Sequence, residues 1–304
     1  MKTIKTMPLR AARFIVLLLF AAIAAISCGP PRVDTIIVGS KNFTEQAILG
    51  ELLAQHLEAR THLNIERRFF LVGTYICQQA LLAGRIDTYV EYTGTALTAI
   101  LKEPVASDPA KVLDRVREEY SRRFNLDVLS PLGFNNTFAM VIRGEDARRL
   151  GIHTLSEAVP FAPQWRAGFG YEFSARPDGY PGLAAKYGLH FAGDPTIMDL
   201  GLMYRALLGK QVDIVAGNST DGILAARDFT VLEDNLHYFP PYEAVPIVRN
   251  QTLERHPEVR DAIAQLAGKI SDAEMQRMNF AVEGDSHQDI ATVARTFLHD
   301  KGLD

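Results

Sequence analysis

Cysteine is scarce in this sequence, since the 304 residues include only Cys28 and Cys77. Two cysteines exclude a disulfide-dense scaffold, and if Cys28 is modified, no intrachain disulfide can form. Cys77 has no metal-ligand partner at useful spacing, so we expect it to be a small buried hydrophobic residue on a helix. The sequence therefore predicts no metal site and no cofactor.

Membrane-spanning runs are also missing. The apolar run Phe14–Ile26 has 13 residues, short of the roughly 18 that a spanning helix usually needs. It follows a basic leader without acidic residues, which is typical of a secretory signal peptide over residues 1–27. Ala25–Cys28 is similar to a bacterial lipobox, with alanine where leucine is usual, and predicts cleavage before Cys28 and lipidation of that residue. The alternative is a plain secreted protein cut near Ser27.

Positive charge is in deficit once the leader is removed. Removal of residues 1–27 takes away four of the 32 basic residues and leaves 28 against 36 acidic residues, a net charge of −8. A chain this acidic is a poor general binder of nucleic acid. The motifs GxSxG, HExxH and the P-loop are all missing from the sequence. We therefore expect neither a nucleic-acid-binding protein nor a hydrolase or nucleotide-binding enzyme of these types.

One stretch is present twice. Ala80–Thr95 (ALLAGRIDTYVEYTGT) aligns without a gap with Ala206–Asp221 (ALLGKQVDIVAGNSTD). Each stretch predicts a helix end, a glycine stop, a short buried strand and a polar loop. The repetition favours two similar lobes, with Asp87 and Asp213 as structural strand-end residues. The alternative is that any two strand–helix units look alike.

Strands and helices alternate along the chain, which predicts an α/β fold. Strands are expected at 35–39, 65–70, 86–90, 128–132, 138–142, 166–171, 212–216 and 229–232, with a short extended piece at 237–239. Helices are expected at 42–60, 74–83, 94–101, 108–124, 199–208, 259–267, 272–279 and 289–299, and 177–187 is expected to contain a turn followed by a helix. Asn42 with Glu45, and Thr154 with Glu157, have the spacing of capping boxes. A tether is expected at 28–34. Two crossings of the chain between lobes, near 133–137 and at 240–242, predict lobe 1 at 35–137 plus 240–304 and lobe 2 at 138–239.

Polar residues in the loops after the strands are candidates for ligand contacts, because open α/β sheets bind ligands there. Lys41 and Thr44 lie between a strand end and a helix start, which suits an anion. The alternative is a self-satisfied helix cap with Lys41 in solvent. Thr74 either caps its own helix or binds a ligand. Thr95 and Ser219 lie in the loops of the two repeated stretches.

Aromatic residues are expected at strand-to-loop ends, namely Tyr92, Tyr171, Phe173 and Tyr242. Aromatic rings hold a quaternary ammonium by cation–π attraction of about 0.5–2 kcal/mol per contact. Three or four such rings in a cage would add up to several kcal/mol. The alternative is that these rings pack as ordinary boundary residues.

Five motifs occur in order: GSKNFTEQ (39–46), EYTGT (91–95), YEF…RPDGYPGL (171–183), STDG (219–222) and FPPYEAVP (239–246). Together they resemble the substrate-binding proteins of bacterial ABC importers for glycine betaine, choline, carnitine and related osmoprotectants. The resemblance covers Thr35 to about Asp304. It implies the two-lobed periplasmic-binding-protein fold of the class with two crossing strands (type II), with the ligand in the cleft between the lobes.

The resemblance also implies an aromatic cage around a trimethylammonium group. Tyr92 and Tyr242 match cage positions, and the segment of Tyr171 and Phe173 approaches the ligand in relatives. Phe138 stands where some members have a cage tyrosine. Lys41 replaces a polar amide residue of some betaine binders, and Asn218 replaces an aromatic or apolar residue. Glycine betaine, choline, carnitine, proline betaine and ergothioneine all stay open as ligands.

The function that we expect from the resemblance is ligand capture without covalent chemistry. The protein would be exported, monomeric and lipid-anchored through Cys28, and would deliver its ligand to an ABC permease driven by a separate ATPase. Two alternatives are an enzyme on the same fold and a sensory ligand-binding protein that signals through a partner.

Overall fold

The computed structural model describes residues 34–284 and 286–304. The predicted signal peptide (1–27), the lipidation site Cys28 and most of the tether (28–34) therefore lie outside the described residues. Residues 36–304 form one compact unit. No helix within the described ranges combines the length and the apolar character that a membrane span requires.

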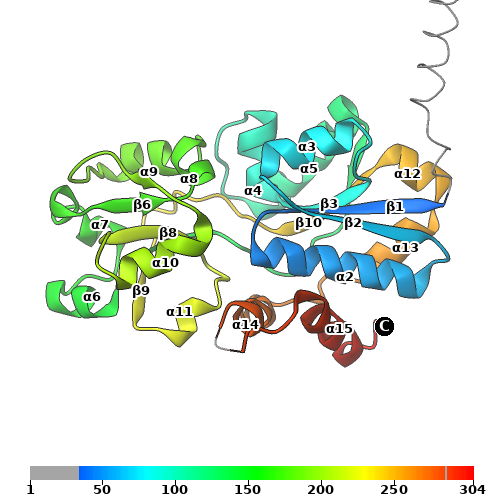
Figure 1. Cartoon of the computed structure of the whole chain (residues 1–304). Helices are drawn as coiled ribbons and strands as arrows, with labels where there is room; N and C mark the ends of the chain where they lie inside the picture. The colour runs from blue at the N-terminus through cyan, green and yellow to red at the C-terminus, as the bar shows by residue number, and fades with distance from the viewer. Residues whose placement is uncertain (1–33, 285) are drawn as a thin grey trace, which may run out of the picture. The chain divides into compact units, whose positions relative to one another are not determined.

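Two five-stranded mixed sheets organise this unit (Figure 1). The first sheet has the order β2 (Asn64–Leu71), β1 (Thr35–Lys41), β3 (Thr88–Tyr92), β10 (Ala244–Arg249), β4 (Leu126–Val128). The second sheet has the order β7 (Thr196–Ile197), β6 (Ala167–Phe169), β8 (Ile214–Asn218), β5 (Phe138–Arg143), β9 (Phe229–Leu232). β10 is antiparallel to β3 and β4, and β5 is antiparallel to β8 and β9. We call the first sheet with its helices lobe 1 and the second sheet with its helices lobe 2.

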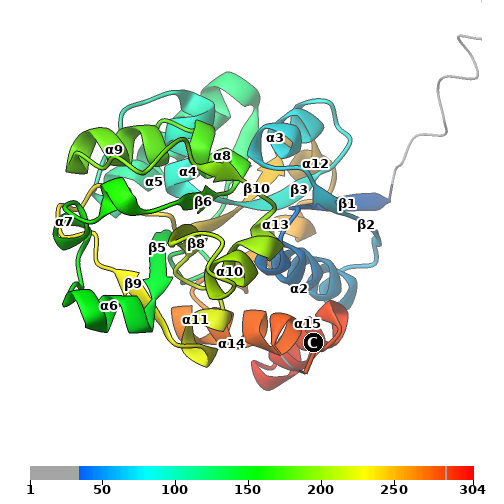
Figure 2. The same cartoon turned by 60° about the vertical axis from the view of Figure 1, so that its left-hand side comes forward.

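Helices cover both faces of each sheet. In lobe 1 they are α2 (Thr44–Arg60), α3 (Thr74–Leu82), α4 (Thr93–Thr95), the π-helical η1 (Ala96–Leu101), α5 (Pro109–Phe124), α12 (Asn250–Arg255), α13 (Glu258–Ala264), α14 (Asp272–Glu283) and α15 (Ile290–Asp300). In lobe 2 they are α6 (Gly144–Leu150), α7 (Leu155–Ala158), the 3-10 turn η2 (Ala162–Gln164), α8 (Tyr171–Ala175), α9 (Tyr180–Tyr187), α10 (Leu200–Leu208) and α11 (Ile223–Ala226). Figure 2 shows α10 on one side of the second sheet and α9 on the other.

The helix α2 shows why the core of lobe 1 is deep. Its leucines Leu49, Leu52, Leu53 and Leu57 are all buried, and α2 is in contact with β2 and β3 of the sheet and with α13, α14 and α15. A helix enclosed on all sides needs no polar face. By contrast, α5 is covered on one side only, and it directs Val112, Val116 and Tyr120 inward and its charged residues outward.

The repeated stretch is a structural repeat, which the two aspartates show. Asp87 Oδ2 accepts a hydrogen bond from the Ile37 amide at 2.9 Å, and the Asp87 amide donates to Ile37 O at 2.8 Å. Asp213 makes the same pair of bonds with Arg166, at 2.9 and 2.8 Å. Both aspartates therefore have the structural role that the sequence predicts, tying the start of one strand to its parallel neighbour.

The boundaries of several elements differ from expectation. The two repeated strands begin and end two residues later than predicted, at 88–92 and 214–218. The turn that ends the preceding helix extends through Ile86 in one stretch and Val212 in the other, because the amides of both residues still donate hydrogen bonds to helix carbonyls. Each strand therefore begins only after the aspartate that follows. Tyr92 consequently ends a strand instead of starting a loop. The strand predicted at 166–171 stops at Phe169, and Tyr171 begins α8. The strand predicted at 128–132 is β4, which ends at Val128, and 237–239 forms no strand.

One of the two predicted capping boxes is wrong, and one strand was not predicted. The capping box of Asn42 and Glu45 does not form, because β1 continues to Lys41, Phe43 is the N-cap residue and the Glu45 side chain is buried. The box of Thr154 and Glu157 does form. The central strand β10 was not predicted, and a proline such as Pro246 is unusual in an interior strand. Pro246 O accepts from the Leu129 amide, so its missing N–H faces the side where the short β4 has already ended.

Candidate functional site

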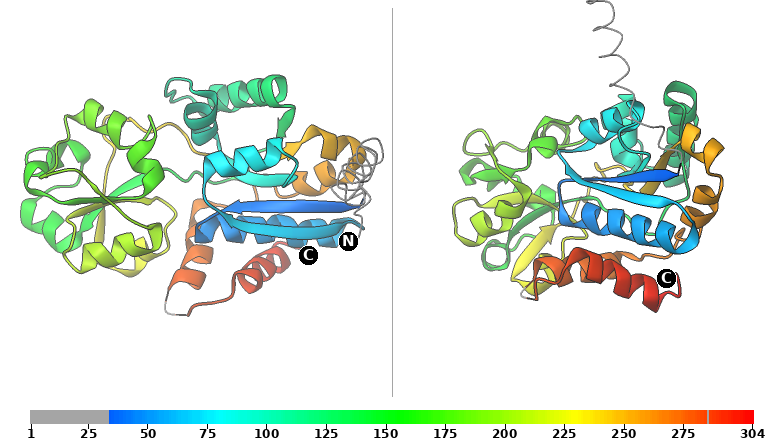
Figure 3. Two further views of the ribbon diagram at one scale, coloured as in Figure 1. Left: turned by 45° about the horizontal axis from the view of Figure 1, so that its top comes forward. Right: turned by 45° about the vertical axis from the view of Figure 1, so that its right-hand side comes forward.

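A pocket of about 440 Å³ opens between residues of lobe 1 and lobe 2. It lies where β1, β3, β6 and β8 end, beside the two segments that link the lobes, which the left view of Figure 3 separates clearly. The lining residues are Lys41, Asn42, Phe43, Val72, Gly73, Tyr92, Thr95, Asn136, Phe138, Gly170, Tyr171, Glu172, Phe173, Arg176, Ile197, Met198, Asp199, Leu200, Ala216, Asn218 and Tyr242.

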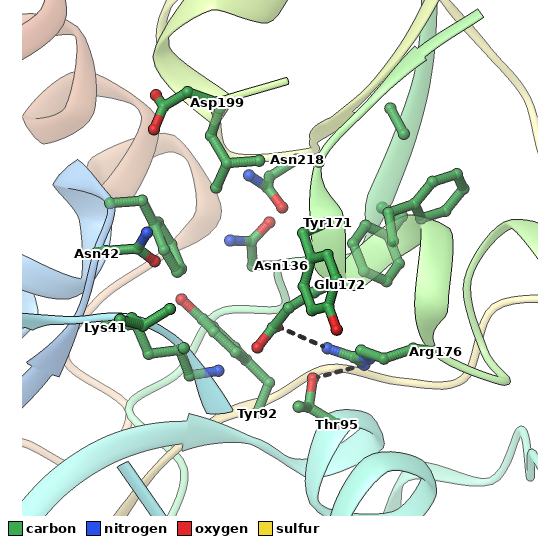
Figure 4. A pocket seen from close by; sticks show the side chains of 18 of the residues that line it. Lys41, Asn42, Tyr92, Thr95, Asn136, Tyr171, Glu172, Arg176, Asp199 and Asn218 are labelled. Carbon is green, nitrogen blue, oxygen red and sulfur yellow. Dashed lines mark hydrogen bonds and ion pairs between the residues drawn. The ribbon is translucent and has the colours of Figure 1, made fainter. Parts of the chain in front are cut away.

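Aromatic rings form one wall of this pocket. The Phe138 ring lies 5.6 Å from the Tyr242 ring and 4.8 Å from the Phe173 ring, measured between centroids, both edge to face. Tyr92 faces the pocket from β3 (Figure 4). The tyrosine hydroxyls do not serve the pocket: Tyr92 donates to Glu45 Oε1 at 2.5 Å and Tyr242 donates to Asp178 Oδ2 at 2.7 Å. Tyr92 and Tyr242 therefore present their rings, and not free hydroxyl groups, to the pocket.

Both of these tyrosines stay protonated. Burial, reinforced by the neighbouring carboxylate, raises the pKa of Tyr92 and of Tyr242 well above the usual value. An ionised carboxylate behind a ring adds negative potential to the face of that ring, because electrostatic interactions are strong in a dry interior. This arrangement suits a cation in the pocket.

Lys41 lines the pocket but its ammonium is already paired. Its Nζ is in an ion pair with Glu91, and both side chains are buried. The Tyr89 hydroxyl and the Tyr92 amide also donate to Glu91, at 3.0 and 2.8 Å. Lys41 Nζ lies 4.9 Å from the centroid of the Tyr92 ring. The solvent-exposed Lys41 of the helix-cap alternative is thus wrong, and one face of Tyr92 is occupied by a protein cation.

Arg176 is the second buried cation of the pocket, and it bridges the lobes. Its guanidinium donates to both oxygens of Asp178, at 3.0 and 2.5 Å, and to Thr95 Oγ1 of lobe 1 at 3.0 Å. Burial disfavours the charged Asp178, but Arg176 and the Tyr242 hydroxyl outweigh this effect and lower the pKa of Asp178. Glu172 adds a second link between the lobes, since its Oε1 accepts from the Thr74 amide at 2.8 Å.

Most of the predicted site residues lie around this pocket. Eight line it: Lys41, Tyr92, Thr95, Phe138, Tyr171, Phe173, Asn218 and Tyr242. Three do not. Thr44 begins α2. The Thr74 amide donates to Glu172, and Ser219 Oγ accepts a hydrogen bond from the Thr137 amide in a linking segment.

The sequence reasoning missed the polar residues that lobe 2 and the linking segments contribute, namely Asn136, Glu172, Arg176 and Asp199. The Arg-Pro-Asp-Gly run at 176–179 carries a usable signal, because an arginine two residues from an aspartate in a turn can pair with it. Asn136 carries no such signal. Among the described residues, no group of three or more histidine, cysteine or acidic side chains could hold a metal ion.

Two mixed sheets, each covered by helices on both faces and joined by two linking segments around a pocket, define a two-lobed binding protein of the periplasmic type. The family described as the substrate-binding domain of ABC-type glycine betaine transport systems matches residues 34–300. A solved glycine betaine/carnitine/choline ABC transporter structure superimposes with a TM-score of 0.72 at 33% identity, covering 88% of this chain and 99% of that chain.

Curated relatives agree over nearly the whole chain. The carnitine transport binding protein OpuCC of Listeria monocytogenes is 33% identical, covering 94% of this chain and 95% of its own length. A glycine-betaine-binding protein of Pseudomonas aeruginosa is 34% identical, covering 96% of each. The chain belongs to the OpuAC family and is the substrate-binding component of an ABC importer. Proteins of this family act outside the cytoplasm and are in general not enzymes.

Proposed function

We propose that the pocket binds a small quaternary ammonium compound of the glycine betaine, choline and carnitine class. The observation that carries the proposal is the aromatic wall of Tyr92, Phe138, Phe173 and Tyr242, whose two tyrosine hydroxyls point into buried carboxylates. A trimethylammonium group cannot donate a hydrogen bond through N–H, so ring faces suit it better than polar acceptors do. The names of the relatives support the same class of ligand.

The charges around the pocket support a ligand that carries a positive charge. The two lining cations are each neutralised, Lys41 by Glu91 and Arg176 by Asp178. The side chains that donate hydrogen bonds to Glu45 are all neutral groups. Burial raises the pKa of Glu45, and hydrogen bonds from these partners oppose the rise. When Glu45 is ionised, its charge lies directly behind the Tyr92 ring and attracts a cation.

We further propose that lobe 1 consists of 35–137 plus 240–304, that lobe 2 consists of 138–239, and that the lobes close around the ligand. The bonds of Thr74 with Glu172 and of Thr95 with Arg176 would form on closure and favour the bound state. The closed protein then delivers its ligand to a permease driven by a separate ATPase. We include in the proposal a signal peptide at 1–27, a lipid anchor on Cys28, a monomeric state and no enzymatic activity.

Thermal unfolding against a ligand panel tests the proposed ligand class. The panel holds glycine betaine, choline, carnitine, proline betaine and ergothioneine, with glycine and proline as controls that lack the quaternary ammonium. A ligand at a hundredfold its Kd stabilises the folded protein by about 2.7 kcal/mol, which is roughly a 5–10 °C shift. We expect at least one quaternary amine to shift the melting temperature, and Tyr92→Ala and Tyr242→Ala to remove the shift. No shift with any of these compounds overturns the proposed ligand class.

A further inference from the structure

The Glu45 side chain occupies an unusual place for a residue in the first turn of a helix. It is only 3% exposed, and its two carboxylate oxygens accept four hydrogen bonds from four separate segments. Oε1 accepts from the Tyr92 hydroxyl at 2.5 Å and from Asn136 Nδ2 at 2.7 Å. Oε2 accepts from the Thr220 hydroxyl at 2.5 Å and from Asn279 Nδ2 at 3.0 Å.

The two oxygens of Glu45 serve two different parts of the molecule. The residues bonded to Oε1, Tyr92 and Asn136, both line the pocket. The residues bonded to Oε2 belong to the contact between the lobes, because Thr220 follows β8 of lobe 2 and Asn279 lies on α14. One rigid carboxylate group thus connects the pocket lining with the opposite lobe.

The Thr220 loop is held at this contact by α14 as well. Asn279 Nδ2 also donates to Thr220 O at 2.9 Å, and Gln276 Nε2 donates to Ser219 O at 2.9 Å. A Cβ placed on Gly222 would lie 2.4 Å from the Phe280 amide nitrogen, so the loop approaches the backbone of α14 directly. The Thr220 hydroxyl therefore meets Glu45 only when the loop is seated against α14.

We infer that Glu45 is a positioning residue that couples the orientation of Tyr92 in the pocket to the seating of the Thr220 loop of lobe 2. The inference rests on the proposed function in one respect only, namely the choice of the compound whose binding is measured. When the lobes separate, Thr220 leaves Oε2; when they close, Glu45 receives its fourth donor and the Tyr92 ring is fixed. Closure and the aromatic wall are thus completed by the same side chain.

A double-mutant cycle on the full chain, purified in mild detergent, tests the coupling. Binding of the panel member that shifts the melting temperature is measured by calorimetry for the parent, Glu45→Gln, Thr220→Val and the double variant. We expect each single change to raise Kd about tenfold or more, and the double variant to bind no more than about threefold weaker than the weaker single variant. Independent, multiplicative losses overturn the coupling, because they mean that the two residues act separately.

Glu51→Gln is the matched control. Glu51 is also a buried glutamate of α2, but it pairs with Arg67 away from the pocket, so Kd should stay within about twofold of the parent. If Glu45→Gln does not fold, Tyr92→Phe replaces it in the cycle, since it keeps the ring and removes one donor to Glu45. An unchanged Kd for Tyr92→Phe overturns the inference.

A ligand-free measurement separates this inference from the proposed function. Amide hydrogen exchange of 218–222 in Glu45→Gln should be about tenfold faster than in the parent, while exchange of 209–213, at the other end of the same strand unit, stays unchanged. Equal exchange at 218–222 in both proteins overturns the inference. If no quaternary amine binds the parent but exchange at 218–222 responds as expected, the proposed ligand class fails and the role of Glu45 stands.

Discussion

Replacing Asp178 with asparagine removes one charge from a buried pair whose other member cannot lose its charge. Arg176 is 3% exposed and Asp178 is fully buried, and an arginine side chain stays protonated in proteins. The variant therefore leaves a guanidinium in the interior without its counter-charge. Breaking a buried pair in this way destabilises a protein by about 3–5 kcal/mol, and the Tyr242 hydroxyl loses its charged acceptor as well.

The assay is denaturant unfolding, followed by circular dichroism and by intrinsic fluorescence. We expect Asp178→Asn to lower the free energy of unfolding by about 3–5 kcal/mol, with a fall in melting temperature of about 10 °C. The double variant Arg176→Met/Asp178→Leu should be closer to the parent in stability, because replacing a whole buried pair by apolar groups is often neutral. It should still bind ligand more weakly, since Thr95 loses its bond across the lobes.

Asp228→Asn is the control for this experiment. Asp228 pairs with Arg148 through two hydrogen bonds of 2.8 and 2.7 Å, as close as the buried pair, but both side chains are more than half exposed. Its removal should leave the unfolding midpoint essentially unchanged. A loss of less than about 1 kcal/mol for Asp178→Asn would refute the reasoning from burial.

Three further predictions concern single residues. Burial, with contributions from nearby acidic groups, raises the pKa of Glu283 to about 7, so its contribution is present below about pH 4.5 and is lost as the pH rises through 7. Glu283→Gln should therefore be more stable than the parent at pH 8 but not at pH 4. The gain in free energy of unfolding at pH 8 should be no more than about 1 kcal/mol, because Glu283 is exposed in the structure and solvent screens its charge; an equal difference at both pH values would contradict this. Gly179→Ala should destabilise lobe 2, because the added Cβ would lie 2.0 Å from Phe173 O, and a melting temperature within about 1 °C of the parent would argue against so close an approach of the two backbones. Burial raises the pKa of the Cys77 thiol to about 12, so Ellman's reagent should modify it only after denaturation, and rapid labelling of the native protein would show that the thiol is accessible.

The features that the sequence predicted are those with local causes. The helix α5 begins at Pro109 behind the N-cap residue Asp108, as its sequence indicates, because both signals act within one turn. The repeated stretch also predicted paired units, since Asp87 and Asp213 carry the same backbone bonds. Of the expected site residues, Tyr92 at the end of β3 and Asn218 at the end of β8 line the pocket, because each strand ends beside its parallel neighbour, β1 or β6, at the edge of its sheet.

The features that were not predicted depend on partners far away in the chain. The central strand β10 pairs with β3 on one side and β4 on the other. The proline-containing sequence of β10 gives no local indication of either partner strand. Arg176 gains its role from Thr95, which is 81 residues distant. Asn136 is brought to the pocket by a linking segment without regular structure. Local patterns predicted where polar side chains lie, but not which of them are paired.

Glu45 shows how a local signal can be outweighed. Asn42 and Glu45 have the spacing of a capping box, whose worth is about 1 kcal/mol at a helix end. The observed alternative gives the carboxylate four donors, from residues 47, 91, 175 and 234 positions away. A hydrogen bond inside a protein contributes about 0.5–1.5 kcal/mol, so four of them together exceed the worth of the cap. Because Thr220 is supplied by the opposite lobe, the preference of Glu45 for its buried position is itself strongest when the two lobes are together.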